Sequence, residues 1–569
     1  MAEHDDDAQA SDITAGYVFE GPTLHLGAAI VGGALHPEAQ VRLPLAMMNR
    51  HGLIAGATGT GKTVTLQVMA EQLSAQGVPV FLSDIKGDLT GLAAPGTAGD
   101  KLAKRTESVG QHWTPTAFPV EFLTLGGDGE GVPVRATVSS FGPLLLSRVL
   151  DLNETQESSL HLVFHYADTN GLELYDLADL RAVISFLTSD QGKAALEALG
   201  GLSKATAGVI LRELITLEAQ GMGAFFGEPE FDTADLLRTT ADGRGIITAL
   251  ELVSVQQKPR LFSTFLMWLL ADMFTELPEV GDLDKPRLVF FLDEAHLLFT
   301  GSSKAFRESI QATVRLIRSK GVGIFFVTQT PKDIPGDVLG QLANRVQHAL
   351  RAFTPDDAKA LRATVSTFPM SRYDLEEVLT SAGIGEAVVT VMNERGAPTP
   401  VAWTRLRAPE SLMGRAAEGV VAAVVESSPL RARYSETVDS HSAFEKLTDV
   451  PTPPPDEPPS PGTTPREDRD AEARRIEEDI LGLPSRPARS REAQPTGHSD
   501  PDGRYTDGRG NEGRDAYGDA YGRSTSRQRS SRAQGKDEMA ELALKAAGVI
   551  GKELARGLFG TKHRKRRWY

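Results

Sequence analysis

One stretch of eight residues constrains the fold of this chain more than any other. Residues 56–63 read Gly-Ala-Thr-Gly-Thr-Gly-Lys-Thr, which fits the pattern G-x-x-x-x-G-K-[ST]. They follow a short apolar run, Leu53–Ala55, and precede a helical pattern from about Thr63 to Gln76. A strand, a glycine-rich turn and a helix in this order form the phosphate-binding unit of α/β domains. The sequence therefore predicts an α/β fold that binds nucleotide phosphates.

The residues of this loop have different expected roles. Glycines let backbone N–H groups surround the β-phosphate, because they add no side chain. The helix N-terminus adds partial positive charge. We expect Lys62 to bridge the β- and γ-phosphates, and the Thr63 hydroxyl to bind Mg²⁺. The residues expected at the nucleotide are Gly56, Ala57, Thr58, Gly59, Thr60, Gly61, Lys62 and Thr63.

A pair of carboxylates follows a second buried strand. Leu288–Leu292 is apolar throughout, and Asp293 and Glu294 come directly after it. In an open α/β sheet the ligand lies outside the carboxyl ends of the strands. We expect Asp293 to hold Mg²⁺ through water and Glu294 to polarise the water that attacks the γ-phosphate. The alternative is an ordinary strand that ends in solvated acids, but with the phosphate loop the pair favours a hydrolase.

Two further polar groups are candidates for the same site. Gln329 follows the apolar strand Gly323–Val327, and we expect it to contact the γ-phosphate or the attacking water; the alternative is a polar strand cap. Arg315 and Arg318 are three residues apart in the expected helix Lys304–Lys320, so they share one face. That face is either a solvated basic surface or the source of an arginine that reaches a neighbouring subunit's γ-phosphate.

The pattern of elements also predicts the domain organisation. Apolar runs that do not alternate indicate a mainly parallel sheet covered on both faces. We expect residues 1–15 to be disordered, residues 16–140 and 241–447 to form a nucleotide-binding core, and residues 141–240 to form an all-helical insertion. Near the end of the core, Glu386–Met392 and Pro400–Leu406 resemble a hairpin or an edge pair. The expected insertion helices are Pro143–Leu150, Glu154–Tyr166, Leu177–Leu187 and Lys204–Ala219.

The composition changes near position 450. Pro451–Arg466 holds eight prolines, and the residues that follow are rich in Arg, Asp, Gly and Ser. We expect residues 448–535 to be a disordered linker. Residues 536–569 are expected to form an amphipathic helix with the basic end Lys562–Arg567. This end is a solvated tail, a nucleic-acid contact, a docking element or an anionic-membrane contact.

Charge and composition exclude several classes of protein. The net charge is −16, and the part before Pro451 holds 56 acidic and 37 basic residues, so nucleic acid could contact only a groove, a channel or the tail. The absence of cysteine excludes thiolate catalysis and Cys-ligated metals. No signal peptide is visible, and the most apolar window, Leu261–Phe274, is too short to span a membrane. We therefore expect a cytoplasmic protein. Candidate channel residues are Lys86, Lys258, Arg260 and Lys304, although surface cations of this kind are more often merely solvated.

The order and wording of these motifs resemble the HerA/FtsK superfamily of ring ATPases, and most closely its bacterial HerA-like branch, the YjgR type. The resemblance runs from about Arg42 to Leu447 and includes NRHGLIAGATGTGKTVTLQ, DIKGDLTGL, LVFFLDEAHLLF, VRLIRSKGVGIFFVTQTPKDIP and NRVQHALRAFTP. It implies a RecA-like core, hydrolysis of ATP with Mg²⁺ and a homohexamer. By motif position it also implies that Arg318 is the arginine finger, with Arg351 as a second candidate.

Two other interpretations are set aside. Asp293–His296 reads DEAH, but helicases with that box place it much closer to the phosphate loop and carry a late Gln/Gly/Arg-rich motif that we do not find here. His296 is then expected to pack beside the site. HerA itself has an N-terminal barrel that docks a nuclease, and the residues before Gly56 are too few for it, with room in Tyr17–Leu45 for at most a small hairpin. A nuclease partner is therefore not supported.

Two functions remain open. The first is a ring motor that translocates or unwinds DNA. The second is an ATP-driven assembly or remodelling factor that acts on a protein or membrane partner. Stimulation of ATP turnover by DNA separates the two.

Overall fold

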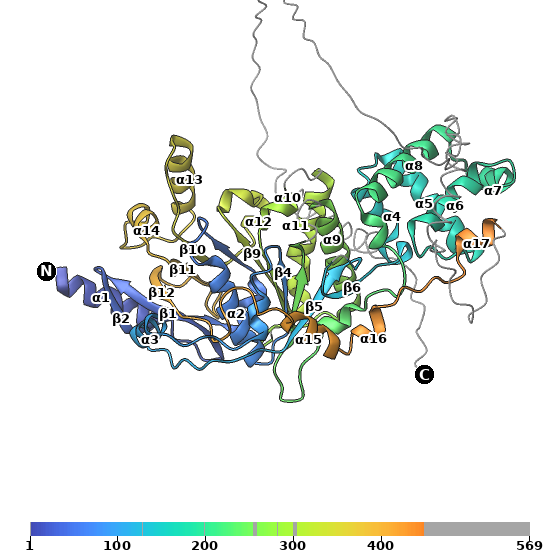
Figure 1. Cartoon of the computed structure of the whole chain (residues 1–569). Coiled ribbons are helices and arrows are strands. Elements are labelled where there is room, and N and C mark those ends of the chain that lie inside the picture. Colours follow the sequence, from blue (N-terminus) through green and yellow to red (C-terminus); the bar gives the residue numbers. More distant parts are fainter. Residues whose placement is uncertain are drawn as a thin grey trace, which may run out of the picture.

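The computed structural model describes residues 2–127, 129–198, 200–253, 259–281, 283–299 and 304–448. The predicted linker, apart from residue 448, and the predicted terminal helix lie outside the described residues. The strands form one twelve-stranded sheet in the order β2-β1-β12-β11-β10-β3-β9-β8-β4-β7-β5-β6 (Figure 1). Their bounds are β1 Thr23–Val31, β2 Ala34–Pro44, β3 Gly52–Ala55, β4 Val80–Asp84, β5 Val120–Leu125, β6 Val132–Val134, β7 Ile247–Glu251, β8 Leu288–Leu292, β9 Val322–Thr328, β10 Asn344–His348, β11 Glu386–Thr390 and β12 Ala402–Leu406.

The sheet is mainly parallel, as predicted. Every pair from β10 across to β6 is parallel, and the pairs from β2 to β10 are antiparallel. The central strands β3, β4, β8 and β9 are buried along their whole length, which explains why their sequences are apolar without alternation. The carboxyl ends of these parallel strands meet at one edge of the sheet.

Helices cover both faces of the sheet. The helix α2 packs on one face through Leu66, Met69 and Leu73. The helices α9 and α11 pack on the other face, where Phe265 lies against Phe81. The helices of eight or more residues are α1 Ala2–Gly16, α2 Lys62–Ala75, α3 Asp100–Ser108, α4 Val138–Val149, α5 Glu154–Asn170, α6 Leu177–Thr188, α8 Lys204–Ala219, α9 Pro259–Glu276, α11 Lys304–Ile317, α13 Pro355–Val365 and α15 Val420–Ser427. Shorter ones are α7 Lys193–Ala198, α10 His296–Phe299, α12 Gly336–Leu339, α14 Leu375–Ser381, α16 Arg431–Tyr434 and α17 Ala443–Thr448.

The helices α4 to α8 gather at one end of the molecule, between β6 and β7 in the sequence (Figure 1). Capping side chains mark several of their starts, with capping boxes at Asn153 and Asp176 and a serine cap at Ser203. Their apolar faces belong to the same core cluster as β5 and β6. The last described helix, α17, returns to this group, where the N–H of Phe444 donates to Asp179 Oδ1 at 3.0 Å.

The N-terminus differs from expectation. Residues 2–16, expected to be disordered, form α1, because Ala10, Ile13 and Tyr17 lie on one helical face and are buried against the sheet. The hairpin expected within Tyr17–Leu45 is present as β1 and β2. The pair β11 and β12 is also present, but it is not at an edge, because β1 pairs with the outer side of β12.

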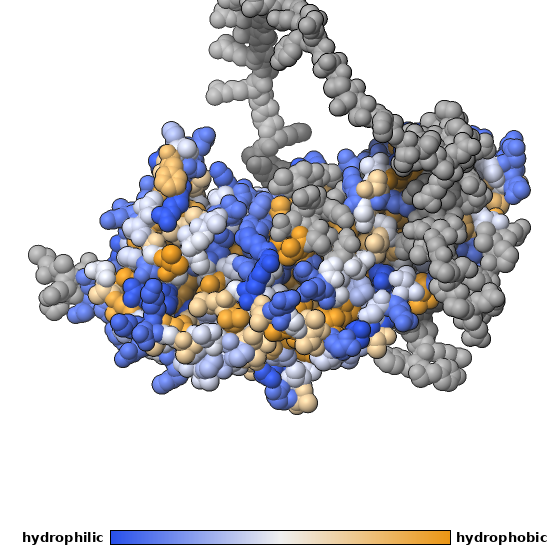
Figure 2. All heavy atoms as spheres, in the orientation of Figure 1, coloured by the Kyte–Doolittle hydropathy of each residue, from blue (hydrophilic) through white to orange (hydrophobic). Residues whose placement is uncertain are grey.

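The two outermost strands of the sheet, β2 and β6, both contain proline. The strand β2 includes Pro37 and Pro44 and pairs with β1 through two register shifts. The strand β6 has three residues, of which Pro133 is the middle one. Proline has no N–H to donate, so both edges are poor templates for further strands. Within the described residues, no helix is long and apolar enough to cross a membrane, and the visible face mixes hydrophilic and apolar residues (Figure 2).

The hydroxyl of Tyr17 tests how α1 is attached. It donates to the carbonyl of Pro400 at 2.9 Å and lies 3.1 Å from that of Val389, and the side chain is buried. We expect Tyr17→Phe to lower the free energy of unfolding by about 1–2 kcal/mol, because a buried carbonyl group loses the donor that the tyrosine hydroxyl supplies. Tyr166→Phe, on a half-buried tyrosine of α5, is the control in chemical denaturation. An equal effect of both changes would contradict the anchoring role of Tyr17.

Candidate functional site

The phosphate loop connects β3 to α2 as predicted. Gly56, Gly59 and Gly61 have φ values of 155°, 78° and 109°, in the region that favours glycine. The loop is held by hydrogen bonds from the N–H of Ala57 to the carbonyl of Ala349 (2.8 Å) and from the N–H of Gly385 to the carbonyl of Thr60 (2.9 Å). The end of β10 and the residue before β11 therefore fix the shape of the loop before any phosphate binds.

Lys62 lies over the loop at the start of α2. Its Nζ donates to the carbonyls of Gly56 (2.8 Å) and Ala57 (3.2 Å), and only 8% of the residue is exposed. Burial lowers the pKa of Lys62, against the opposing charges of Glu294 and Asp293. A buried ammonium held by two carbonyl groups is well placed to exchange them for phosphate oxygens.

Asp293 lies at the end of β8 and is almost fully buried. Its N–H donates to Ser83 Oγ at 2.9 Å, and its Oδ1 accepts from the N–H of Glu294 at 2.9 Å. Burial and the charge of Glu294 raise the pKa of Asp293 to about 7. Its Oδ2 is buried and has no hydrogen-bond partner among the described residues. A buried oxygen without a donor is costly unless something else satisfies it, and a water bound to Mg²⁺ fits it.

Glu294 follows in a left-handed backbone conformation, with φ of 46°. Its Oε1 lies 2.5 Å from Lys86 Nζ, and its Oε2 lies 3.4 Å from Nδ1 of His296. Burial opposes ionisation of Glu294, but the hydrogen bond and charge of Lys86 outweigh it and lower the pKa of this carboxyl. The structure thus presents an ionised carboxylate beside the phosphate loop, with His296 next to it as expected.

The other predicted polar residues lie at opposite edges of the sheet. Gln329 is exposed just past β9, at the same edge as the phosphate loop, because Thr328 pairs with Ala55. Arg351 is exposed at this edge too, past the end of β10. Arg318 is exposed in the short 3-10 helix η6 (Arg318–Lys320), which precedes β9.

The position of Arg318 limits what it can reach. The predicted helix Lys304–Lys320 ends earlier, at Ile317, so Arg315 lies on α11 and Arg318 lies in the turn that leads into β9. The seven residues of β9 span about 23 Å at ~3.3 Å each. Arg318 is therefore at the far edge of the sheet from its own phosphate loop.

Two residues that sequence reasoning did not single out support the loop. His348, at the end of β10, is fully buried with its Nε2 2.9 Å from Thr65 Oγ1, and burial with the charge of Lys62 lowers its pKa to about 3. Arg105 of α3 donates to the carbonyls of Gly385 (2.6 Å) and Leu406 (2.9 Å), beside the loop. In the sequence, the only feature that could have indicated a role for His348 was its place inside NRVQHALRAF. No sequence feature indicated a role for Arg105.

The candidate channel residues are placed unevenly. Lys86 pairs with Glu294, and exposed Lys304 lies 3.5 Å from Glu308. Lys258 lies outside the described residues, and Arg260 is in α9 with a side chain that is not described.

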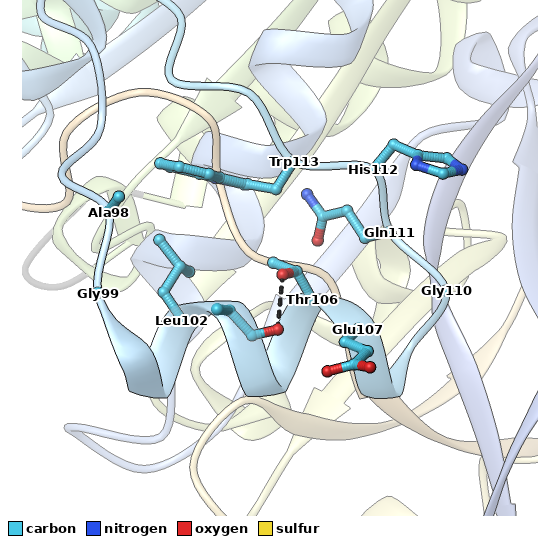
Figure 3. A pocket seen from close by; sticks show the side chains of 10 residues that line it. Ala98, Gly99, Leu102, Thr106, Glu107, Gly110, Gln111, His112 and Trp113 are labelled. Carbon is cyan, nitrogen blue, oxygen red and sulfur yellow. Dashed lines mark hydrogen bonds between the residues drawn. The ribbon is translucent and has the colours of Figure 1, made fainter.

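A cavity of about 540 Å³ lies away from these residues, on α3 and the segment after it (Figure 3). Leu102, Thr106, Gln111 and Trp113 line it, and Trp113 donates its indole N–H to the carbonyl of Pro409. None of the predicted site residues lines this cavity.

The side chain of Lys62 can be tested directly. We expect Lys62→Ala to weaken nucleotide binding about 10- to 100-fold, because the ammonium no longer contacts the β- and γ-phosphates. Lys285→Ala is a matched control, since Lys285 also donates to two backbone carbonyls but is far from the loop. Titration with a fluorescent nucleotide measures both, and unchanged affinity in Lys62→Ala would remove the phosphate role from this loop.

Comparisons with known proteins find two named relatives of this chain. The DNA double-strand break repair helicase HerA of Saccharolobus solfataricus is 20% identical over 361 residues, which cover 63% of this chain and 65% of the relative. The protein of the same name from Sulfurisphaera tokodaii is 22% identical over 368 residues, which cover 64% and 66%. The chain thus matches slightly less than two thirds of either relative's length.

Solved structures with a similar fold include the conjugative coupling protein TrwB, at 15% identity and a TM-score of 0.46, covering 71% of this chain and 94% of that chain. VirB4 of Thermoanaerobacter pseudethanolicus has 15% identity and a TM-score of 0.41, covering 71% and 99%. A TrwB structure in complex with ADP and Mg²⁺ has 16% identity and a TM-score of 0.43, covering 69% and 98%.

The sequence profile described as Helicase HerA-like C-terminal matches residues 32–495, which is most of the chain. This protein therefore belongs to the HerA-like family, in the HerA/FtsK superfamily of P-loop ATPases with a RecA-like core.

Proposed function

We propose that this protein hydrolyses ATP with Mg²⁺ and uses the energy to move or unwind DNA, as a ring of identical subunits. The observation that carries the proposal is the convergence of four parallel strand ends. The ends of β3, β8 and β9 bring Lys62, Asp293, Glu294 and Gln329 to one edge of the sheet, and β4 adds Lys86. This set combines phosphate binding, a metal ligand and a base.

We assign a role to each residue of this set from its contacts. Lys62 and the loop N–H groups bind the β- and γ-phosphates, and Thr63 with Asp293 holds Mg²⁺, which neutralises phosphate charge when it is bound. In this proposal Glu294 accepts a proton from the attacking water, and Gln329 orients that water. Arg318, too far from its own phosphate loop, would stabilise charge in a neighbouring subunit's site.

The ring and the DNA substrate rest on the family relationship. The two HerA relatives are named as DNA double-strand break repair helicases. Arg318, at the far end of β9 from its own phosphate loop, would contribute to hydrolysis only at a neighbouring subunit's site. The acidic body is compatible with DNA held in a central channel and not on the outer surface. A DNA substrate would also agree with the expected cytoplasmic location.

The test is ATP turnover of the full chain with no DNA, with single-stranded DNA and with duplex DNA. We expect DNA to raise turnover. If neither DNA form changes the rate of ATP turnover, the DNA motor is rejected. That result would favour the alternative, an ATP-driven assembly or remodelling factor for a protein or membrane partner. Absence of turnover would reject the hydrolase itself, and the particle mass with nucleotide bound reports ring formation.

A further inference from the structure

A lysine outside the predicted catalytic set holds the catalytic base. Lys86 Nζ lies 2.5 Å from Oε1 of Glu294, although the two residues are 208 positions apart in the sequence. They meet because β4 and β8 are adjacent parallel strands, so the residues that follow them emerge at the same edge of the sheet. The contact is therefore a product of the sheet topology beside the phosphate loop.

The two partners differ in how far solvent reaches them. The side chain of Glu294 is 9% exposed, and that of Lys86 is 44% exposed. An anion from solution can approach the ammonium of Lys86, but a cation cannot approach the carboxylate of Glu294 in the same way. An anion from solution can therefore replace Glu294 as the partner of Lys86.

The backbone around Lys86 is firmly held. Asp84 accepts from the N–H of Gly87 at 2.7 Å and from the N–H of Leu89 at 3.0 Å, which closes the turn. The carbonyl of Lys86 accepts from Arg415 at 2.6 Å. Because the main chain is fixed on both sides, exchange of partners requires only rotation of the lysine side chain.

The pairing also affects what Glu294 can do. One carboxylate oxygen is occupied by the ammonium, and the backbone of Glu294 is in a left-handed conformation that a residue with a Cβ adopts at a cost. The ammonium thus fixes the direction of the carboxylate and competes with a proton for Oε1, whereas Oε2 has no hydrogen-bond partner among the described residues.

We propose that Lys86 is a positioning residue that restrains Glu294 and releases it when a phosphate oxygen takes the lysine Nζ. This inference rests on the proposed function, because restraint of a base matters only in a hydrolase. The phosphate oxygen comes either from the γ-phosphate of the nucleotide or from the DNA backbone. Both are oxyanions that an ammonium binds as it binds a carboxylate.

The experiment is a binding cycle with four full-length proteins: wild type, Lys86→Met, Glu294→Gln and the double variant. The probes are a non-hydrolysable ATP analogue with Mg²⁺, and a short DNA duplex without nucleotide. If Glu294 competes with phosphate for Lys86, Glu294→Gln should tighten one probe about five- to tenfold, the scale of a half-exposed charged hydrogen bond. In the Lys86→Met background the same change should have no effect. The probe that tightens identifies the source of the phosphate.

Other outcomes overturn the proposal. If Glu294→Gln tightens the binding of neither probe, Glu294 does not compete with phosphate for Lys86. The same conclusion follows if Glu294→Gln tightens binding equally with and without Lys86→Met. Lys86→Arg keeps the charge and should restore the coupling, which a purely structural role of lysine would not predict. Lys86→Met leaves Glu294 without its cation, so thermal unfolding is compared with the double variant, in which both charges are gone.

Kinetics separates this inference from the function on which it rests. Where the wild type hydrolyses ATP, Lys86→Met should raise turnover without DNA and reduce its stimulation by DNA; lower turnover with stimulation intact would contradict the restraint. Absence of wild-type turnover would reject the hydrolase, yet the binding cycle would still report whether Lys86 exchanges partners.

Discussion

Replacing Glu294 by Gln should lower the rate of ATP hydrolysis by about 10²–10⁴-fold, the usual contribution of a general base. The amide keeps the shape of the side chain but cannot accept the proton of the attacking water. Nucleotide binding should survive and become no weaker, because Lys62 and the loop N–H groups are unchanged and a negative charge beside the phosphates is removed. Single-turnover hydrolysis and nucleotide affinity are the two measurements.

The control for this variant is Glu308→Gln, the same chemical change on an exposed residue of α11. It should leave both quantities within about twofold of the wild type, as surface changes usually do. Near-normal hydrolysis by the Glu294 variant would show that another group accepts the proton.

Removal of the Arg318 guanidinium should have a similarly large effect. An arginine that stabilises the charge of phosphoryl transfer contributes about 10³–10⁵ in rate, or roughly 4–7 kcal/mol. We expect Arg318→Ala to abolish turnover while nucleotide binding survives, because this residue does not contact its own phosphate loop.

Mixing experiments show whether Arg318 acts between subunits. Subunits with Arg318→Ala keep an intact phosphate loop, and subunits with Lys62→Ala keep an intact arginine, so mixed rings should regain part of the activity. The control is Arg315→Ala, an exposed arginine on the neighbouring helix. Rings shown to be mixed but still inactive would indicate that the arginine acts within its own subunit, or that Arg315 or Arg351 has the role, of which Arg351 lies at the same edge of the sheet as the loop.

The parts of the site that could be predicted from the sequence are those whose residues are adjacent to one another along the chain. The turn from Gly56 to Gly61 and the pair Asp293 and Glu294 each sit directly beside an apolar strand, and the structure places each at a strand end. A strand, its polar tip and the next helix are adjacent in sequence, so their pattern is enough to place them at one sheet edge.

The parts that were missed depend on contacts between distant residues. The Lys86–Glu294 pair, the contact of His348 with Thr65 and the bonds from Arg105 to Gly385 all join separate elements. Only the order of strands in the sheet brings these residues together, and the sequence of a single segment does not predict that order. The N-terminal helix was missed for the same reason: its acidic sequence is weakly helical, and burial of Ile13 and Tyr17 stabilises it.

The prolines at both sheet edges have a consequence for any assembly of this chain. The outermost strand β6 has three residues with Pro133 at its centre, and the other outermost strand, β2, contains Pro37 and Pro44, so both are poor templates for a backbone ladder with a second copy. In the proposed ring, copies would then meet mainly through side chains and loops. Such boundaries would shift by small distances without breaking a row of backbone hydrogen bonds, so each subunit of that ring would be free to change its tilt against the next as nucleotide binds and leaves.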